Sequence, residues 1–370
     1  MSSVDIVLVK SISVPADPRA MKIVRSLSKR YRVAVLGWDR TRSHQNDPQI
    51  AGVVFSRSLR VRAPYGKVTL LMYYPVFWAW VFAYLVALRP RAVHACDFDT
   101  LIPCFLFRVC FRSKLTFDSF DRYAMAFIPV RFGLLFRIVD GLEALIASKC
   151  DALVTVSEER LRTFQRRPRI TAVTMNCPEP AFANVGTSAR PRLRDDLLLV
   201  YAGAIAQDRG LGILDQVVRS CENVDLLVAG RIIDNSIEPL RRNPRIKFLG
   251  FLEYSKALEL QADADVIPLL YDPALPINRV ANPNKLFEAM MLAVPVISNV
   301  CREIIEDVGC GIFVSYDPED VRRAVITLRD NPSLRKTMGS KGRIAYESKF
   351  NWQVMERKLF KLYEILLKPE

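Results

Sequence analysis

Short apolar segments alternate with amphipathic segments from the start of this 370-residue chain. Residues 5–10 have the composition of a β-strand, residues 19–30 that of a helix, and residues 33–37 that of the next strand. Each expected strand is apolar on both faces, which is typical of parallel strands buried between two helical layers. The alternation continues with strands at 53–57, 92–95, 114–118 and 152–156 and helices at 68–88, 100–111 and 130–148. This pattern predicts a doubly wound α/β fold.

The alternation stops and restarts near the middle of the chain. Between residues 178 and 196 the composition changes to Pro, Ala, Gly, Ser and Arg with little periodicity, as in a linker. Beyond it we expect strands at 197–202, 224–229, 246–249, 264–269 and 295–298 and helices at 211–220, 257–261 and 285–292. Because this length suggests about two domains, we predict domains over residues 1–185 and 186–350 and a final amphipathic helix over 351–370.

Positive charge is concentrated in the first half of the chain. Residues 1–185 hold 27 Lys and Arg against 14 Asp and Glu, whereas the remaining residues hold 26 against 25. A basic domain indicates an anionic partner such as nucleic acid, phospholipid or a phosphorylated substrate, although much of this charge is expected to be solvated surface.

One segment, residues 68–88, is long enough and apolar enough to cross a bilayer. Pro75 interrupts it, and its aromatic residues lie along its middle instead of at two ends. We therefore interpret it as a helix that is partly core and partly in contact with a membrane; a buried helix and a true span are the alternatives. The first ten residues resemble no signal peptide, so we expect a cytoplasmic protein.

The eight cysteines form no C-x-x-C pair, and His44 and His94 are the only histidines. We therefore expect a reduced interior without a metal ion. His94 lies within an apolar segment and is predicted to be a packed core residue.

Several familiar active-site motifs are absent from the sequence. It contains no GxGxxG, GxxxxGK[ST], HExxH or GxSxG, which disfavours dehydrogenases, P-loop nucleotidases, zinc proteases and α/β-hydrolases. Instead, Gly203 and Arg209 lie in a loop, YAGAIAQDRG, that follows an expected strand. Ligands of open α/β sheets bind at such strand ends. The alternative is a tight turn with a solvated arginine.

A second candidate site begins at Asn282, a good helix N-cap, followed by Pro283 at the expected first helical position. The free amides of this helix start favour an anion such as a diphosphate, and Lys285 and Arg209 add full positive charges. Glu288 is placed to accept two hydrogen bonds from a ribose diol. Ordinary capping and a solvated glutamate are the alternatives.

Together these segments resemble the GT-B glycosyltransferases, in particular the retaining, nucleotide-sugar-dependent family 4. In the first half the similar segments are VHACDFDTL (93–101), FDSFD (117–121) and ALVTVSE (152–158). In the second half they are VYAGAIAQDRG (200–210), FLG (248–250), ADV (264–266), PNKLFEAMMLAVPVI (283–297), 309–318 and 331–342. The resemblance implies two Rossmann-like domains that face each other across a cleft, with the last helix crossing back to the first domain.

The resemblance also implies roles for individual residues. Arg209, six residues after Gly203, corresponds to the cation that holds the donor diphosphate, and Glu288 to the second glutamate of an E-x7-E motif that binds the ribose. This chain departs from the motif, because Val280 replaces the first glutamate and Ala204 an arginine that often follows the glycine. Arg209, Lys285 and Glu288 are therefore the catalytic candidates, with Lys285 as a hypothetical substitute for the missing cation. The predicted donor-binding residues are Gly203, Arg209, Asn282, Asn284, Lys285, Leu286 and Glu288.

In the first domain, the resemblance implies an acceptor site at the strand ends. The turn Asp17-Pro18-Arg19 resembles an element at the start of the family's chains, although helix capping by Asp17 explains it equally well. The family's histidine and glutamate in the second segment are Phe120 and Asp121 here. The acceptor-side candidates are Asp17, Arg19, Asp97, Asp99, Asp118 and Asp121.

These observations predict a retaining transferase that moves a hexose from a UDP- or GDP-sugar to a lipid-linked or cell-surface glycan, without a metal ion or other cofactor. The basic, aromatic first domain predicts peripheral binding to the anionic inner face of a membrane. A sugar-nucleotide epimerase and a degenerate, noncatalytic membrane-associated GT-B protein are the alternatives. A nucleic-acid-binding protein explains the charge alone and is disfavoured, because the anion-site motifs lie in the nearly neutral half.

Overall fold

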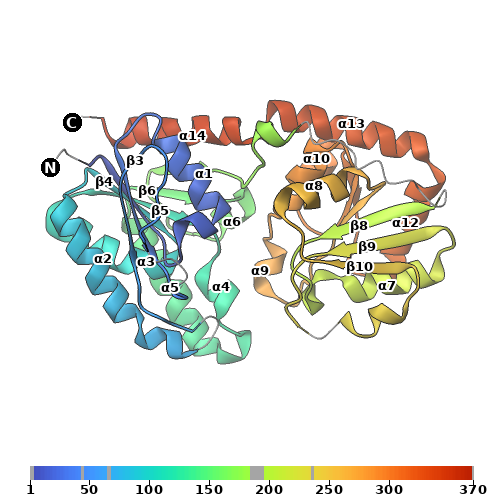
Figure 1. Cartoon of the computed structure of the whole chain (residues 1–370), viewed down its shortest axis with the longest axis horizontal. Coiled ribbons are helices and arrows are strands. Elements are labelled where there is room, and N and C mark those ends of the chain that lie inside the picture. The colour runs from blue at the N-terminus through green and yellow to red at the C-terminus, as the bar shows by residue number, and fades with distance from the viewer. Residues whose placement is uncertain (1–3, 43–45, 65–67, 184–195, 235–236, 369–370) are drawn as a thin grey trace. The chain divides into compact units, whose positions relative to one another are not determined.

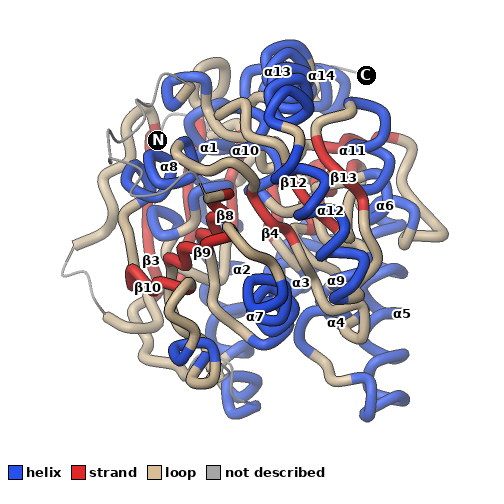
Figure 2. The backbone as a smooth tube through the Cα atoms, turned by 90° about the vertical axis from the view of Figure 1, so that its right-hand side faces the viewer, coloured by secondary structure: helices blue, strands red, loops and turns tan. Residues whose placement is uncertain are grey.

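The computed structural model describes residues 4–42, 46–64, 68–183, 196–234 and 237–368. The chain forms two compact units, Met1–Thr174 with Met355–Glu370 (unit 1) and Met175–Val354 (unit 2). In each unit parallel strands lie between helices, as the sequence predicts (Figures 1 and 2). Most of the expected linker, residues 184–195, falls outside the described residues.

Unit 1 is built on a seven-stranded parallel sheet with the strand order β3-β2-β1-β4-β5-β6-β7. All residues of β1, β2, β4 and β6 are buried, which confirms that these apolar strands are covered on both faces. The strands are β1 (Ile6–Val9), β2 (Val33–Trp38), β3 (Val53–Leu59), β4 (Ala92–Cys96), β5 (Lys114–Ser119), β6 (Ala152–Thr155) and β7 (Ile170–Val173). The last of these was not expected from the sequence.

Helices cover both faces of this sheet. The chain turns back from β1 to β2 through α1 but advances from β3 to β6 through α2, α3 and α5, so right-handed crossovers put these helices on opposite faces. Figure 1 shows α1 and α14 on one face and α2, α3 and α5 on the other. The helices are α1 (Pro18–Leu27), α2 (Tyr74–Leu88), α3 (Phe98–Phe111), α4 (Tyr123–Phe127), α5 (Gly133–Lys149), α6 (Glu158–Arg162) and α14 (Trp352–Leu366).

The segment expected to be one helix over residues 68–88 is divided. A 3-10 turn, Val68–Met72, precedes α2, which has Pro75 in its first turn. Of the aromatic residues of α2, Tyr74 and Phe77 are buried and the others are half-buried. Phe77 stacks on Trp38 at 4.9 Å, and the Trp78 indole donates to the Asp99 carbonyl at 2.8 Å. Among the described residues, no helix has the length and hydropathy needed to span a bilayer.

Unit 2 contains two three-stranded parallel sheets with the strand orders β10-β9-β8 and β11-β12-β13. A parallel β-bridge between Leu199 and Val266 connects the two sheets. The strands are β8 (Leu197–Ala202), β9 (Val224–Ala229), β10 (Ile246–Gly250), β11 (Ile267–Leu269), β12 (Val296–Ser298) and β13 (Gly311–Phe313). The helices are α7 (Leu211–Ser220), α8 (Tyr254–Ala262), α9 (Pro276–Arg279), α10 (Asn284–Met291), α11 (Arg302–Val308), α12 (Pro318–Asp330) and α13 (Pro332–Ser348). The sequence did not predict β13, α9 or α11–α13.

Candidate functional site

Two glycines allow the ends of β8 and β9 to meet in unit 2. The Gly203 amide donates to the Ala229 carbonyl at 2.8 Å, which continues the ladder past the end of β8. Gly230, which follows β9, has a φ of +147°, and a Cβ built on it would lie 1.6 Å from the Gly203 carbonyl oxygen. A side chain at position 230 would therefore push the loop after β8 out of place. The sequence analysis identified Gly203 but not the supporting Gly230.

Lys285 lies directly against Gly203, although 82 positions separate them in the sequence. A Cβ built on Gly203 would lie 2.6 Å from Lys285 Cε and 2.8 Å from Lys285 Nζ. Lys285 is in the first turn of α10, where the helix dipole is positive. The structure therefore brings together two of the predicted donor-binding residues.

Arg209 ends a 3-10 turn, Gln207–Arg209, beyond the same loop. Its guanidinium lies 4.6 Å from the centre of the Tyr271 ring and donates to Asn278 Oδ1 at 3.3 Å. Asn278 in turn donates to Asp208 at 3.1 Å and to the Asp272 carbonyl at 3.0 Å. Burial, only partly opposed by Arg209, raises the pKa of Tyr271 to about 12, so the ring under the arginine stays neutral. Tyr271 and Asn278 belong to no motif that the sequence analysis used.

Glu288 projects from α10 and is only 7% exposed. Gln261, on α8, donates to Glu288 Oε2 at 3.1 Å. Tyr254, at the start of α8, also contacts Glu288, and burial together with this carboxylate raises the pKa of Tyr254. The two residues of α8 therefore orient the glutamate, and neither was identified from the sequence.

The start of α10 differs from the sequence prediction. The helix begins at Asn284, with Pro283 in the N-cap position, so Asn282 is not its cap and Pro283 is not its first residue. Proline accepts this position because its φ of −70° fits the extended backbone before a helix. Both polar atoms of the Asn282 side-chain amide are buried without a hydrogen-bond partner in the described structure. Asn284 is exposed, whereas the Leu286 side chain is fully buried.

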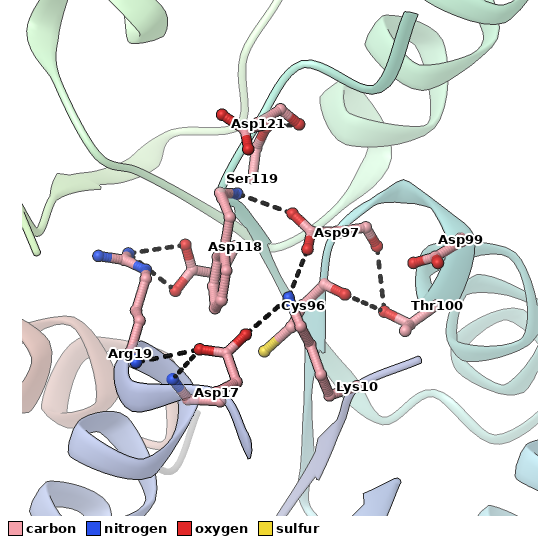
Figure 3. A network of polar contacts seen from close by, with 12 residues as sticks. Lys10, Asp17, Arg19, Cys96, Asp97, Asp99, Thr100, Asp118, Ser119 and Asp121 are labelled. Carbon is pink, nitrogen blue, oxygen red and sulfur yellow. Dashed lines mark hydrogen bonds and ion pairs between the residues drawn. The ribbon is translucent and has the colours of Figure 1, made fainter. Parts of the chain in front are cut away.

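In unit 1, Lys10 follows β1 and Asp97 follows β4. Lys10 binds two of the acceptor-side candidates, Asp97 and Asp17 (Figure 3). Its ammonium lies 2.5 Å from Asp97 and 3.2 Å from Asp17, and 3.8 Å from the centre of the Phe120 ring. Burial alone would lower the pKa of Lys10, but the two carboxylates outweigh it and raise the pKa, so the lysine is charged. The sequence analysis did not identify Lys10.

Arg19 and Asp118 form a buried ion pair beside this lysine. Arg19 Nη2 donates to the two Asp118 oxygens at 2.9 and 3.1 Å, and Arg19 also donates to the carbonyl and hydroxyl of Thr174. His94 lies 3.3 Å from Asp118 and hydrogen-bonds the Tyr363 hydroxyl of α14 at 2.8 Å. Burial would raise the pKa of Asp118, but Arg19 and His94 hold it below its usual value. His94 is buried, as predicted, but it joins a polar network as well as the core.

Asp97 has an unusual backbone conformation. Its φ of 68° and ψ of 164° lie in a region that residues other than glycine seldom adopt. The Asp97 amide donates to the Asp118 carbonyl at 2.9 Å, and its carboxylate accepts from the Phe120 amide at 3.0 Å. These contacts, together with Lys10, hold the carboxylate at the end of β4.

Asp17 has a second role besides binding Lys10, and Asp99 and Asp121 have partners of their own. Asp17 accepts from the amides of Arg19 and Ala20, so it caps α1 as well as binding Lys10. Asp99 is buried and accepts from the Tyr74 hydroxyl of α2 at 3.0 Å, away from Lys10. Asp121 is exposed and pairs with Arg160 at 2.9 Å.

Residues 196–331 match the family model described as glycosyl transferases group 1. The chain is 29% identical over 190 residues to the capsular polysaccharide biosynthesis glycosyltransferase CapM of Staphylococcus aureus, which covers 48% of each chain. It is also 29% identical, over 41% of its length and 42% of the relative's, to a GDP-mannose-dependent monoacylated alpha-(1-6)-phosphatidylinositol monomannoside mannosyltransferase of Corynebacterium glutamicum. The chain thus matches just under half the length of these two relatives.

Solved structures resemble the chain over almost its whole length. Sucrose-phosphate synthase from Thermosynechococcus elongatus aligns with a TM-score of 0.79 at 16% identity over 98% of both chains. Anabaena HepE in complex with UDP aligns with a TM-score of 0.74 at 15% identity over 98% of this chain and all of that one. A putative UDP-N-acetylglucosamine 2-epimerase from Listeria monocytogenes aligns with a TM-score of 0.63 at 12% identity over 100% and 99% of the two chains. Identities this low indicate a shared fold only.

The family match covers the part of unit 2 that contains Gly203, Arg209, Lys285 and Glu288. The fold likeness extends over both units. This chain therefore contains a glycosyl transferases group 1 domain over residues 196–331 and has the GT-B fold of two Rossmann-like domains.

Proposed function

We propose that this chain is a retaining glycosyltransferase that transfers a hexose from a UDP- or GDP-sugar to a lipid-linked or cell-surface glycan at the cytoplasmic face of a membrane. The observation that carries the proposal is the position of Lys285 against Gly203, together with the Asn282 amide, three residues earlier in the chain, which has no hydrogen-bond partner among the described residues. A lysine, a helix N-terminus and an unsatisfied amide favour an oxyanion ligand such as a diphosphate. The relatives' names support the acceptor class, since one names capsular polysaccharide and the other a phosphatidylinositol mannoside.

In this proposal the residues of unit 2 act on the departing diphosphate. The bond between the sugar's anomeric carbon and the diphosphate breaks, and a bond from that carbon to an acceptor hydroxyl forms on the same face. The hydroxyl proton passes to the departing phosphate oxygen. Lys285, Arg209 and the free amides of α10 stabilise the negative charge that develops there, which is the main electrostatic requirement of the step. Glu288, oriented by Gln261, accepts hydrogen bonds from the ribose.

Thermal unfolding in the presence of nucleotides tests the proposal. UDP, GDP, ADP, CDP and their sugar conjugates are added, with and without EDTA, to the wild type, Arg209→Ala and Glu288→Ala. Arg219→Ala on α7 and Glu259→Ala on α8 are matched controls, because both side chains form local ion pairs within one helix. We expect a selective, EDTA-insensitive rise in Tm that the two site variants lose and the controls keep. No shift from any nucleotide would contradict the proposal.

Product analysis separates the proposed transferase from an epimerase, whose fold is also similar. The preferred nucleotide sugar is incubated alone and then with glycan or lipid-linked acceptors. We expect an unchanged sugar configuration without acceptor and release of the nucleoside diphosphate with a suitable acceptor. Inversion of the sugar in the absence of acceptor would identify an epimerase instead.

A further inference from the structure

The outward side of α5 in unit 1 is apolar. Leu134, Ile138, Leu142 and Leu145 are 76%, 57%, 41% and 53% exposed. Their spacing of four, four and three residues places them in one stripe along the helix. The opposite side of α5 buries Glu143 and Ala147. Helices that pack on a core ordinarily turn polar residues to water, so this arrangement is inverted.

The neighbouring helix α3 extends this apolar surface. It exposes Leu106 and Val109, at 53% and 61%. A groove of about 300 Å³ between α2 and α3 is lined by apolar side chains and one thiol: Trp78, Ala79, Phe82, Pro103, Leu106 and Cys110. The helices α2, α3 and α5 pack in sequence on one face of the sheet (Figure 1). We call Leu106, Val109, Leu134, Ile138, Leu142 and Leu145 the outer face.

The charges around the outer face are almost all positive. Within residues 69–149 the exposed basic residues are Arg89, Arg91, Arg112, Arg131, Arg137 and Lys149. Over the same described stretch, Asp121 is the one exposed acidic residue, and Arg160 pairs with it. Beyond the C-terminal end of α5, Ser148 and Asp151 line a cavity of about 500 Å³ together with the cations Lys114, Arg167 and Arg169 and with Ile365 and Leu366 of α14. Exposed cations therefore lie just before α5 (Arg131), on it (Arg137) and at its last residue (Lys149).

We propose that the outer face docks on an anionic phospholipid bilayer. The stripe of α5 inserts between acyl chains, and the exposed cations Arg131, Arg137 and Lys149 contact phosphate headgroups. A second copy of this chain is a poorer occupant, because face-to-face packing would bring like charges together. The inference rests on the membrane association in the proposed function and assigns it to α5 and α3. It adds α5 and α3 to the segment 68–88, which itself exposes Leu71, Met72 and Val76 at 58%, 77% and 51%.

Co-sedimentation of the full chain with vesicles tests this inference. One set of vesicles is phosphatidylcholine, and the other is phosphatidylcholine mixed with phosphatidylglycerol. We expect binding to the mixed vesicles and little to phosphatidylcholine alone. The double variant Ile138→Ser with Leu142→Ser should lose at least about ten-fold in affinity, because two partly inserted apolar side chains are removed. Ile344→Ser, at a position 66% exposed on α13, is the matched control and should bind like the wild type.

Charge variants at Arg137 on α5 and at Arg131, in the 3-10 turn Val130–Phe132 just before it, provide a second measurement. Arg131→Gln with Arg137→Gln should lower the affinity for mixed vesicles by about five-fold per residue and weaken its dependence on salt. Arg302→Gln with Arg323→Gln in unit 2 is the matched control, since both arginines are exposed and paired with a glutamate or aspartate on their own helix. Wild-type affinity for the mixed vesicles in both the serine variant and the glutamine variant would overturn the inference. So would a self-association of the wild type, measured by sedimentation velocity without lipid, that the serine variant abolishes.

Nucleotide-induced thermal shifts on the same variants separate this inference from the proposed function. The residues of the outer face belong to unit 1, and none lies among the predicted donor-binding residues. We expect the serine and glutamine variants to keep the nucleotide-induced shift in Tm, although they bind the vesicles more weakly. Loss of the nucleotide response in Arg209→Ala with vesicle binding retained would support two separate surfaces.

Discussion

The strand-end clusters of the two units have similar positions but different charge balance. In unit 1, Lys10 and Arg19 are paired with Asp17, Asp97 and Asp118 at 3.2 Å or less. In unit 2, Lys285 forms no ion pair with any described residue, and the amide of Asn282, just before α10, has no hydrogen-bond partner among them. The cations of the unit 1 cluster are thus paired within it and fix the local conformation, whereas Lys285 in unit 2 keeps an unpaired positive charge, which suits the proposed anionic ligand.

The first prediction, with the largest expected effect, concerns the two arginines of these clusters. Arg19→Ala leaves Asp118 buried without its main partner and should lower the free energy of unfolding by about 3–5 kcal/mol. Arg209→Ala should lower it by less than about 1 kcal/mol, because this side chain is 27% exposed and its ion pair with Asp208 is partly screened. Urea unfolding at neutral pH measures both changes. Equal losses in the two variants would contradict the contrast between the clusters.

The same comparison depends on pH. Because the folded state holds the pKa of Asp118 below its usual value, this carboxylate stabilises the fold above its unfolded pKa and loses that effect as the pH falls through the folded one. The difference between wild type and Arg19→Ala should therefore shrink in acid. Asp118→Asn in the Arg19→Ala background should recover part of the lost stability at neutral pH, since it removes the unpaired charge.

The second prediction tests another buried charge of unit 1. Burial raises the pKa of Glu143 to about 8, and Arg122, whose Nη1 is 4.0 Å away, opposes this rise only in part. Glu143 Oε1 has no hydrogen-bond partner among the described residues. In the unfolded chain this carboxyl loses its proton near pH 4.5, whereas in the folded protein it keeps the proton up to about pH 8. The free energy of unfolding is therefore highest below pH ~4.5 and falls as the pH rises to about 8. Glu143→Gln should therefore nearly match the wild type at pH ~4.5 and exceed it by roughly 4 kcal/mol at pH ~8.

Urea unfolding across this pH range measures the difference. The Tyr123 amide donates to Glu143 Oε2, and a glutamine oxygen can accept the same bond. Glu347→Gln on α13 is the control, because that side chain is exposed and pairs with Arg343 on the same helix. The same pH dependence in both variants would show that burial of Glu143 is not the cause.

The third prediction concerns the open cluster of unit 2. Lys285→Ala should raise the Kd for the preferred nucleoside diphosphate by about 10–100-fold, since a hydrogen bond to a charged group contributes roughly 1.5–3 kcal/mol. Its Tm without ligand should change little, because no described ion pair is lost. Titration calorimetry measures the Kd, and Lys256→Ala, an exposed lysine on α8, is the matched control. An unchanged Kd would remove Lys285 from the proposed site.

Sequence periodicity predicted those parts of the fold that local patterns determine. The helix expected over 211–220 and the strand expected over 197–202 have the bounds of α7 and β8. The sites were partly predictable for the same reason, because Gly203, Arg209 and Lys285 follow strands or begin helices. Lys10 and Asn278 were not, since their partners lie 87 and 69 positions away along the chain and only the folded chain brings them together.

The orientation of α5 shows why burial was harder to predict. The sequence predicts an amphipathic helix there, but both sides carry apolar residues, so periodicity does not determine which side faces the sheet. The folded chain buries Glu143 beside Arg122 and leaves leucines exposed. For the segment 68–88, the sequence predicts a helix that is partly core and partly in contact with a membrane. Packing on Trp38 buries Phe77, while Leu71, Met72 and Val76 stay exposed. Tertiary contacts decided both cases.

The fourth prediction, with the smallest effect on stability, tests the contact that defines the unit 2 cluster. Gly203→Ala places a methyl group where Lys285 Cε and Nζ now lie, at 2.6 and 2.8 Å. The flexible lysine can move, so the free energy of unfolding should fall by less than about 1 kcal/mol. The displaced ammonium should nevertheless weaken nucleotide binding almost as much as Lys285→Ala does.

A double-mutant cycle identifies the cause of that loss. Once Lys285→Ala has removed the side chain, adding Gly203→Ala should cost little further affinity, because the methyl group then has room; strong non-additivity is the expected signature of direct contact. Gly212→Ala on α7 is the control, since a Cβ there meets nothing within 4 Å, and this variant should leave binding unchanged and stabilise the helix slightly. Additive losses from Gly203→Ala and Lys285→Ala would mean that the glycine acts through something other than the lysine.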